Sequence, residues 1–409
     1  MQTSFRRGRA NRFFLYSHDG LGLGHVRRNL AVAGALTEAS PGSSVLVATS
    51  ADEAESLGIR PGIDVLKLPG LRKIDNEHYA ARRLPVSWSE IRAVRAKLLA
   101  TAVESFRPAV LLVDKHPVGV GGELRPALEA ARLAGARAAF GLRDILDDPD
   151  ELRADWSAHG VYEQIAEHFD CVLVYGQRDV TDPIAEYGFP DELAAMTSFC
   201  GYVLSPGGPD DRETAAELLP AGSKSEPLVL ATAGGGQDGF PLLSAFVEAA
   251  AGAPWRAVVV AGPQCESKHL RRLHRLAARS GVAFRRFVPG LAKAFGVLDA
   301  LVCMGGYNTL TEAVSSGVPT VCVPRAHPRT EQLIRARAFA RRGLLHVLEP
   351  RSLDAAALRN EVESAMTEPL RERPPSLDLD GAERAAELLL ELAADAPARL
   401  ERLTGAGAR

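Results

Sequence analysis

The chain has 409 residues, of which 46% are hydrophobic and 24% charged, and its formal net charge is −3 at pH 7. This length favours two domains, and the composition is that of a globular protein able to bury large cores. The charge excludes a global attraction to nucleic acid, although the basic residues 6–12 leave contact with an anionic surface open beside a plain solvated terminus.

Two classes of segment are missing from the sequence. No apolar run reaches the roughly 18 residues that span a bilayer, and charges stand where a signal peptide has its apolar region. The five cysteines show no CxxC spacing. We therefore expect a cytoplasmic protein with reduced cysteines and no zinc site.

In the first half of the chain, short apolar runs alternate with longer amphipathic stretches. The apolar runs predict strands at 12–17, 43–50, 107–117, 136–145 and 171–176. Between the first two, the apolar residues of 25–39 recur at helical spacing. This β-α-β order is typical of a mostly parallel sheet covered by helices.

The pattern breaks at residues 204–226, whose Pro, Gly and charged residues predict a linker. Strand-like segments then return at 227–239, 255–263, 281–290, 298–306 and 318–324. We therefore expect an α/β protein with two Rossmann-like domains facing across a cleft, residues 1–203 and 227–380. Residues 381–409 are expected to form a helix and tail that pack back on the N-terminal domain.

Each predicted domain opens with a strand and a glycine-rich turn. The first turn, Gly20-x-Gly22-x-Gly24-His25, fits the G-x-G-x-x-G dinucleotide fingerprint poorly, and no G-K-[ST] follows that would make it a P-loop. The second turn is the glycine run 234–236. Backbone N–H groups in such turns favour anions, so a phosphate site is expected there, with tight strand-to-helix packing as the alternative.

Gly305 and Gly306 form a third glycine turn, which opens another predicted helix. Asn308 and Thr309 lie in the first turn of that helix, and Glu312 follows. A carboxylate at this place can accept hydrogen bonds from the two hydroxyls of a ribose. The alternative for Glu312 alone is a solvated helix residue.

The stretch "GGYNTLTEAVSSGVPTVCVP" (305–324) resembles the donor-binding signature of GT-B-fold glycosyltransferases, and above all of the MurG-like, family 28-type enzymes and related bacterial glycosyltransferases. Four more stretches resemble the family in the correct order: "LGLGHVRRNLAVAGAL" (21–36), "AGGGQDG" (233–239), "FVPGLAKAF" (287–295) and "HPRTEQ" (327–332). The resemblance covers nearly the whole chain and implies the GT-B fold and transfer of a sugar from a nucleotide-sugar, most simply a UDP-sugar such as UDP-N-acetylglucosamine.

The resemblance also implies roles for single residues of the C-terminal domain. The backbone of Phe287 and Val288 would pair with the base, Glu312 would hold the ribose, and Glu331 and Gln332 would reach the donor sugar. The other donor-binding residues, grouped around the diphosphate, are Gly235, Gly236, Gly305, Gly306, Asn308 and Thr309. Backbone amides and a helix dipole can carry the charge of the departing diphosphate, so neither a metal nor a cofactor is expected.

Glycosyl transfer also needs a base on the acceptor side. His25 is the first candidate because it ends the glycine loop and an imidazole titrates near neutral pH. A structural histidine is the alternative, and His18 is a weaker candidate. Asp114 ends a predicted buried strand, where related transferases have an aspartate that orients the base; a turn cap is its alternative. The remaining acceptor-side residues are Gly22, Gly24, Lys115 and His116.

Three other segments carry charge. The cationic residues 68–88 are expected to form an acceptor-side loop, with a plain surface loop as the alternative. The aspartates of 147–150 look like a metal-binding signature, but we interpret them as the capped start of a helix. The basic helix expected at 268–280 leaves weak peripheral membrane contact open.

Departures from the family pattern limit the functional hypothesis. Met304 replaces a phosphate-contacting histidine of some relatives, Arg27 and Arg28 replace an aromatic residue and a proline, and Gly236 replaces a serine. The acceptor is therefore expected to differ from the peptidoglycan lipid intermediate. No second glutamate follows Glu312 at a spacing of eight, which favours inversion. A UDP-sugar 2-epimerase of the same fold and a non-catalytic sugar-nucleotide binding protein remain alternatives, and neither the acceptor nor the oligomeric state follows from the sequence.

Overall fold

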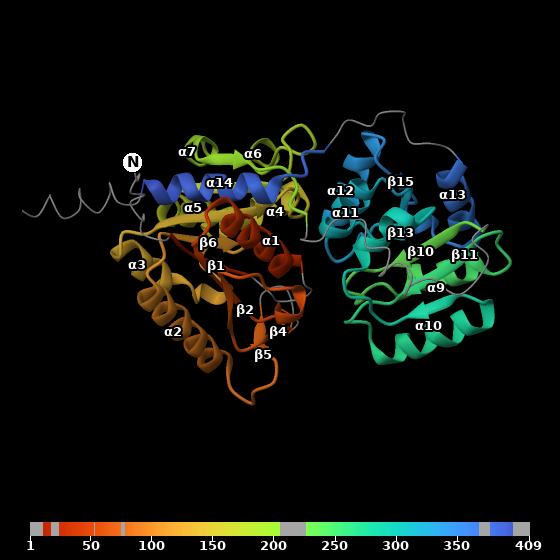
Figure 1. Ribbon diagram of the computed structural model, residues 1–409, viewed down its shortest axis with the longest axis horizontal. Coiled ribbons are helices and arrows are strands. Elements are labelled where there is room, and N and C mark those ends of the chain that lie inside the picture. Colours follow the sequence, from red (N-terminus) through yellow and green to blue (C-terminus); the bar gives the residue numbers. More distant parts are fainter. Residues whose placement is uncertain are drawn as a thin grey trace, which may run out of the picture. The chain divides into compact units, whose positions relative to one another are not determined.

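The computed structural model describes residues 11–17, 24–52, 54–74, 78–204, 226–367 and 377–395. The chain divides into two compact units (Figure 1). The first unit consists of Met1–Asp144, Arg153–Leu204 and Asp380–Arg409, and the second of Ile145–Leu152 and Ser205–Leu379. The predicted linker lies outside the described residues except for its two ends, and so does the tail beyond residue 395. The expected cleft between the domains stays a prediction.

The first unit is built on a seven-stranded sheet in the order β3-β2-β1-β6-β7-β8-β9, and every neighbouring pair of strands is parallel. Its strands are β1 (Arg12–Tyr16), β2 (Ser44–Thr49), β3 (Ile63–Lys67), β6 (Val110–Asp114), β7 (Arg137–Arg143), β8 (Cys171–Tyr175) and β9 (Thr197–Phe199). β1 and β6 form the centre, and their apolar runs are buried because helices cover both faces of a parallel sheet. A separate antiparallel pair joins β4 (Leu71–Lys73) and β5 (Tyr79–Ala81).

The helices of the first unit cover this sheet. They are α1 (Gly24–Ala39), α2 (Trp88–Phe106), α3 (Arg125–Leu133), α5 (Val161–His168), α6 (Pro183–Glu186), α7 (Asp191–Ala195) and α14 (Gly381–Ala394), with 3-10 turns η1 (Ala54–Leu57) and η2 (Val120–Gly122). α14 is the last described helix, yet it packs against α1, the first (Figure 1). A Cβ at Gly381 would lie 2.6 Å from the carbonyl oxygen of Gly201, so glycine permits the close return of the chain to this unit.

The second unit repeats the same plan with six parallel strands in the order β12-β11-β10-β13-β14-β15. They are β10 (Leu228–Thr232), β11 (Arg256–Val260), β12 (Ala283–Arg285), β13 (Ala300–Cys303), β14 (Thr320–Cys322) and β15 (His346–Val347). The helices are α9 (Phe240–Ala250), α10 (Ser267–Ser280), α11 (Tyr307–Ser316), α12 (Glu331–Arg341) and α13 (Ala355–Thr367), with η3 (Leu291–Val297) and η4 (Pro350–Ser352). A buried cluster of aliphatic and aromatic side chains from the strands and from α9, α10 and α13 forms its core.

The segment Ile145–Leu152 follows β7 in the chain but groups with the second unit. The helix α4 (Pro149–Ala158) begins within it. Asp148 Oδ1 accepts hydrogen bonds from the backbone N–H groups of Asp150 and Glu151, at 3.0 and 3.3 Å, as the cap of a helix start does. Asp148 thus has the helix-capping role expected of this cluster, whereas Asp147 Oδ1 accepts a hydrogen bond from the Thr330 backbone N–H at 2.9 Å.

Each sheet has one point where the strand order reverses direction. In the first sheet it lies between β1 and β6, and in the second between β10 and β13. Open parallel sheets bind ligands at the carboxyl ends of the strands beside such a switch point. The loops after these four strands are therefore the places where functional residues are expected in each unit.

Candidate functional site

Two residues of the first switch point come together as the sequence predicts. Asp114 is the last residue of β6, and His25 lies in the first turn of α1, the helix that follows β1. His25 Nδ1 is 2.8 Å from Asp114 Oδ2. His25 is 8% exposed and Asp114 is fully buried.

Arg28 completes this group. It lies one helical turn after His25 on the same face of α1 and is also buried. Its Nη2 donates to Asp114 Oδ2 at 2.6 Å, and its guanidinium stands 5.0 Å from the centre of the Tyr175 ring. One carboxylate oxygen therefore holds both His25 and Arg28.

The shared oxygen decides the tautomer of His25. An ionised carboxylate only accepts hydrogen bonds, so the proton of the neutral imidazole is placed on Nδ1, facing Asp114 Oδ2. Arg28 Nη2 also lies 2.9 Å from Nδ1, but in this tautomer both groups are donors that share one acceptor. The lone pair is then on Nε2, the nitrogen that can take up a proton.

Burial and charge set the protonation states. Burial lowers the pKa of His25 to about 4, and Arg28 and Lys115 act in the same direction, while Asp114 opposes them. Burial alone would raise the pKa of Asp114, but Arg28 and His25 outweigh it and hold the pKa of that carboxyl well below its usual range. At neutral pH the group therefore consists of an ionised Asp114, a charged Arg28 and a neutral His25.

The other acceptor-side residues lie near this group or outside the described residues. Lys115 and His116 directly follow Asp114, and the chain turns at Lys115 with a left-handed φ of +76°. Gly24 begins α1. His18 and Gly22 lie outside the described residues. The acceptor roles of all these residues stay predictions.

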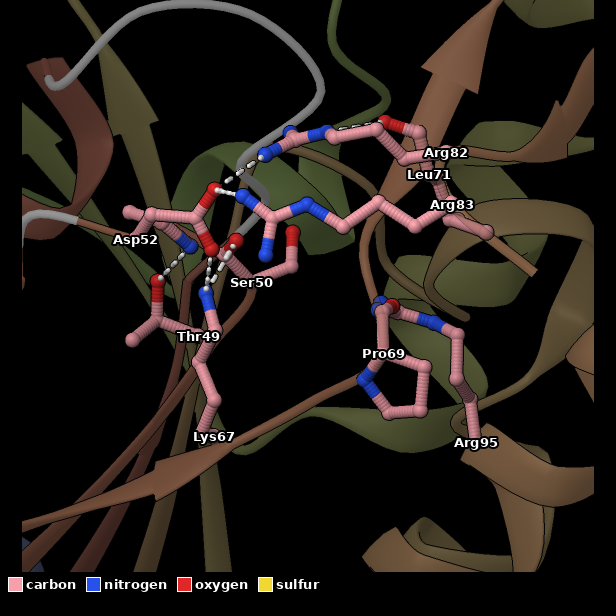
Figure 2. A network of polar contacts seen from close by, with 10 residues as sticks. Thr49, Ser50, Asp52, Lys67, Pro69, Leu71, Arg82, Arg83 and Arg95 are labelled. Atoms are coloured by element: carbon pink, nitrogen blue, oxygen red, sulfur yellow. Dashed lines mark hydrogen bonds and ion pairs between the residues drawn. The ribbon is translucent and has the colours of Figure 1, made fainter.

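The cationic segment 68–88 contains the β4–β5 pair, and Asp52 ties it to the end of β2 (Figure 2). Asp52 pairs with Lys67 at 2.8 Å, Arg83 at 2.9 Å and Arg82 at 3.4 Å. Lys67 also donates to the Ser50 carbonyl oxygen at 2.7 Å. These contacts fix the segment beside the carboxyl end of β2.

A second, buried network holds the base of the same segment. Arg95 on α2 pairs through two nitrogens with both carboxylate oxygens of Glu123, each at 2.6 Å, and donates to the Pro69 carbonyl oxygen at 2.7 Å (Figure 2 shows Arg95 and Pro69). Tyr16 at the end of β1 donates to Glu123 at 2.6 Å. All three side chains of this network are buried and mutually paired, so we assign them to structure.

In the second unit, the glycine turns meet at the switch point. A Cβ at Gly234 would lie 3.8 Å from Thr309 Oγ1, which places the turn after β10 beside the start of α11. Gly236 has φ +91°, and a Cβ there would lie 2.3 Å from the Ala261 carbonyl oxygen. Gly305 has φ +83° and lies against Cys322 and Gln332. Glycine suits these positions because the backbone has a left-handed φ there, and at Gly236 and Gly305 neighbouring atoms lie too close for a side chain.

The helix α11 presents the predicted donor residues on one face. Gly306 is its N-cap, no side chain caps it there, and a Cβ at Gly306 would meet nothing within 4 Å. Asn308, Thr309 and Glu312 are half-buried. Asn308 and Glu312 are one turn apart, about 6 Å along the helix axis. This spacing allows one ligand to place an anionic group at the helix start and a ribose beside Glu312.

The remaining donor-site candidates surround this edge of the second sheet. Phe287 is 43% exposed, and Val288 packs on Ala294 of η3. Glu331 is 6% exposed and accepts a hydrogen bond from Arg325 Nη2 at 2.6 Å. Gln332 accepts one from the backbone N–H of Arg325 through Oε1 at 3.3 Å. The donor contacts of these residues stay predictions.

Sequence reasoning missed several polar neighbours of the site. From the sequence alone, Arg28 is only a departure from the family pattern, although its spacing of three from His25 predicts that both lie on the same helix face. Arg325 and Asp238 pair at 2.9 Å across 87 residues, a contact that no local pattern signals. Gln264, whose side chain borders Gly235, was missed for the same reason.

Among the described residues, no group of three or more His, Cys, Asp or Glu side chains is arranged to hold a metal ion. In the same part of the chain, no helix is both long and apolar enough to cross a membrane.

Comparison with known sequences extends this picture. Residues 235–389 match the family model of the glycosyltransferase family 28 C-terminal domain. The UDP-N-acetylglucosamine–N-acetylmuramyl-(pentapeptide) pyrophosphoryl-undecaprenol N-acetylglucosamine transferase of Stutzerimonas stutzeri is 24% identical over 313 residues, 73% of this chain and 80% of that protein. The protein of the same name from Corynebacterium efficiens is 30% identical over 92 residues, 22% of this chain and 26% of that protein. The chain spans about a quarter of the length of the Corynebacterium protein and about half of that of a protein of the same name from Proteus mirabilis.

Solved structures show the fold. MurG of Acinetobacter baumannii superposes with a TM-score of 0.57 at 16% identity, over 94% of this chain and 100% of that one. A putative UDP-N-acetylglucosamine 2-epimerase from Listeria monocytogenes superposes with a TM-score of 0.60 at 12% identity, over 95% of this chain and 96% of that one. The predicted α/β architecture of the GT-B type is confirmed. The family match, the curated relatives and the fold together make the chain similar to the MurG-like glycosyltransferases of family 28.

Proposed function

We propose that the protein is an inverting, metal-independent glycosyltransferase that moves a sugar from a UDP-sugar to an acceptor hydroxyl or amine. The observation that carries the proposal is the contact of His25 Nδ1 with Asp114 Oδ2 at 2.8 Å, at the switch point of the first sheet. It leaves Nε2 as the proton acceptor in a histidine that is neutral at pH 7.

In the proposed step, the acceptor proton passes to His25 Nε2 while the acceptor oxygen or nitrogen forms a bond to the anomeric carbon of the sugar. The bond from that carbon to the diphosphate oxygen breaks, and its electron pair stays on the departing UDP. Asp114 stabilises the imidazolium that forms. Proton transfer to a positioned base contributes about 10²- to 10⁴-fold to such a reaction.

The second unit supplies the donor side of the proposal. The glycine turns bring backbone N–H groups and the positive end of α11 to one edge of the sheet, where they can stabilise a diphosphate as its charge develops. Glu312, one turn along α11, would accept the ribose hydroxyls. UDP-N-acetylglucosamine is the first donor to test because the curated relatives carry that sugar in their names.

Two other functions were open from the sequence. The epimerase is not favoured, because the family match and the curated relatives are transferases, and the fold shared with a putative epimerase does not decide between them. A non-catalytic nucleotide-sugar binding protein would have no use for the buried pair of His25 and Asp114.

The test is incubation with UDP-N-acetylglucosamine, with and without an acceptor extract from a bacterium, while free UDP and sugar isomers are measured. We expect UDP release that increases with the extract and is lost in His25→Gln. An isomer formed without UDP would instead support the epimerase. UDP binding by calorimetry without either product would support the binding protein.

A further inference from the structure

Arg325 occupies a special position in the second unit. It lies in the loop after β14, and its Nη1 donates to Asp238 Oδ2 at 2.9 Å in the loop after β10. β13 lies between these two strands in the sheet. The Arg325–Asp238 contact therefore spans the carboxyl end of β13, where Gly305 and Gly306 lead into α11.

The two carboxylates that hold Arg325 differ in their surroundings. The side chain of Glu331 is 8% exposed and accepts from Nη2 at 2.6 Å, whereas that of Asp238 is 50% exposed. An ion pair with a half-exposed partner is worth little, while a buried one is costly to break. Glu331 thus fixes the guanidinium, and Asp238 is the contact that an incoming anion can replace.

We propose that Arg325 binds the diphosphate of the donor in exchange for Asp238 and stabilises the departing UDP. The inference rests on the proposed function, because it assumes a nucleoside diphosphate at the start of α11. When the sugar–oxygen bond breaks, its electron pair adds a negative charge to the diphosphate. Arg325 stays protonated, so it meets that charge with hydrogen bonds and no proton is transferred.

The loops after the neighbouring strands β13 and β14 differ in charge. Met304, just before Gly305, supplies no charge to this edge of the sheet. Arg325 supplies a cation to the same edge from the neighbouring strand β14. In this proposal Glu331 positions Arg325, which is consistent with the burial of the Glu331 carboxylate.

The test compares the affinities of the full-length chain for UDP and for uridine by calorimetry. Arg325→Gln should weaken UDP binding about 10-fold or more and leave uridine binding nearly unchanged. Asp238→Asn should keep or increase UDP affinity, because it removes only the competing carboxylate. Arg337→Gln on α12 is the matched control, since it breaks a solvent-accessible pair with Glu349, which lies just before η4, and should change neither affinity.

The outcomes separate this inference from the proposed function. If Arg325 only held its two loops together, Arg325→Gln and Asp238→Asn would weaken UDP and uridine binding to a similar extent, and the inference would be overturned while the proposed function stood. If the unmodified protein bound no UDP, the proposed donor would be wrong and the role of Arg325 would fall with it.

Discussion

The two units have the same sheet plan but use their switch points differently. In the first unit, the ends of β1 and β6 bring the ionisable side chains of His25, Arg28 and Asp114 to one carboxylate oxygen. In the second, the ends of β10 and β13 bring glycines whose backbone is held too close to its neighbours for a side chain. Under the proposed function, the same topology would supply proton transfer through side chains in one unit and, in the other, anion binding to which backbone N–H groups contribute beside Arg325.

This contrast predicts different consequences of substitution. A change in the first switch point should alter the reaction and its dependence on pH, with donor binding preserved. A change in the second should alter the affinity for the nucleotide. The following predictions test that separation.

The largest effect is expected for His25→Gln. Glutamine can still donate to Asp114 but cannot take up the acceptor proton, so turnover should fall by about 10²- to 10⁴-fold. UDP affinity should remain within about twofold, because the donor residues lie in the other unit. Steady-state kinetics and calorimetry measure the two quantities.

His25→Ala serves as the companion variant, since it removes the contact to Asp114 as well as the base. Similar losses in both variants would assign the effect to the missing base. Near-normal turnover in His25→Gln would show that His25 has a structural role only.

Protonation of His25 should make stability depend on pH. Its pKa of about 4 in the folded chain lies below the ordinary 6.5, so the unfolded chain binds a proton more readily as the pH falls through this window. The contribution of His25 to the free energy of unfolding should therefore be fully present above pH 6.5. It should decrease by about 3 kcal/mol as the pH falls towards 4. Asp114 affects lower pH only, because its pKa is depressed from 3.8.

Urea unfolding at pH 6.5 and 4.5 measures this change. The loss of stability should be clearly smaller in His25→Gln than in the unmodified chain, which isolates His25 from other histidines. The acid limb of kcat/KM should also lie near pH 4, and an acid limb near 6.5 would contradict the buried, neutral state of His25.

The order of the strands, more than their existence, limited what the sequence could predict. Alternating apolar runs predicted most strands of both sheets but not β3, β9 and β15, which lie at sheet edges, and the glycine turns marked the carboxyl ends of β1, β10 and β13. The contact of Arg28 with Asp114 spans 86 residues and depends on β6 lying beside β1. Alternation of strands and helices does not specify that neighbour relation, so the ion pair could not be predicted.

The glycines illustrate a second limit. The sequence showed a run of three at 234–236, which fits a phosphate turn and tight packing equally well. Only the structure shows that Gly236 lies against the backbone of Ala261, in the loop after β11. The position of Glu312 one turn after Asn308 was predictable because spacing within one helix is local, whereas the pairing of Asp238 with Arg325 required the sheet order.

Gly236→Ala tests whether the backbone of the glycine turn after β10 binds the nucleotide. Its Cβ would lie 2.3 Å from the Ala261 carbonyl oxygen at a φ of +91°, so the turn must shift. We expect UDP affinity to fall about 10-fold or more, since misplaced N–H groups lose their charged partner. Turnover at saturating donor should change less than in His25→Gln.

Gly281→Ala is the matched control for strain. Gly281 ends α10 at φ +71°, and a Cβ there would meet nothing within 4 Å. It should cost about 1 kcal/mol of stability through its left-handed backbone and leave UDP affinity unchanged. Equal effects of the two variants on UDP affinity would remove the assigned role of the turn after β10.

The smallest effect is expected for the substitution Asp52→Asn in the loop after β2 of the first unit (Figure 2). Its three cationic partners are Lys67, Arg82 and Arg83, whose side chains are 44, 31 and 76% exposed, so water and salt screen the pairs. The free energy of unfolding should decrease by less than about 1 kcal/mol, and the decrease should fade at high salt.

Asp64→Asn is the control, because it makes the same change of charge on β3, where the carboxylate accepts from the Val65 N–H. A loss several times larger in Asp52→Asn, unchanged by salt, would mean that this network behaves like the buried Arg95–Glu123 pair. Strong interactions between polar side chains would then extend beyond the loops after β1 and β6. The difference from the glycine turns of the second unit would in that case be a property of the whole first unit.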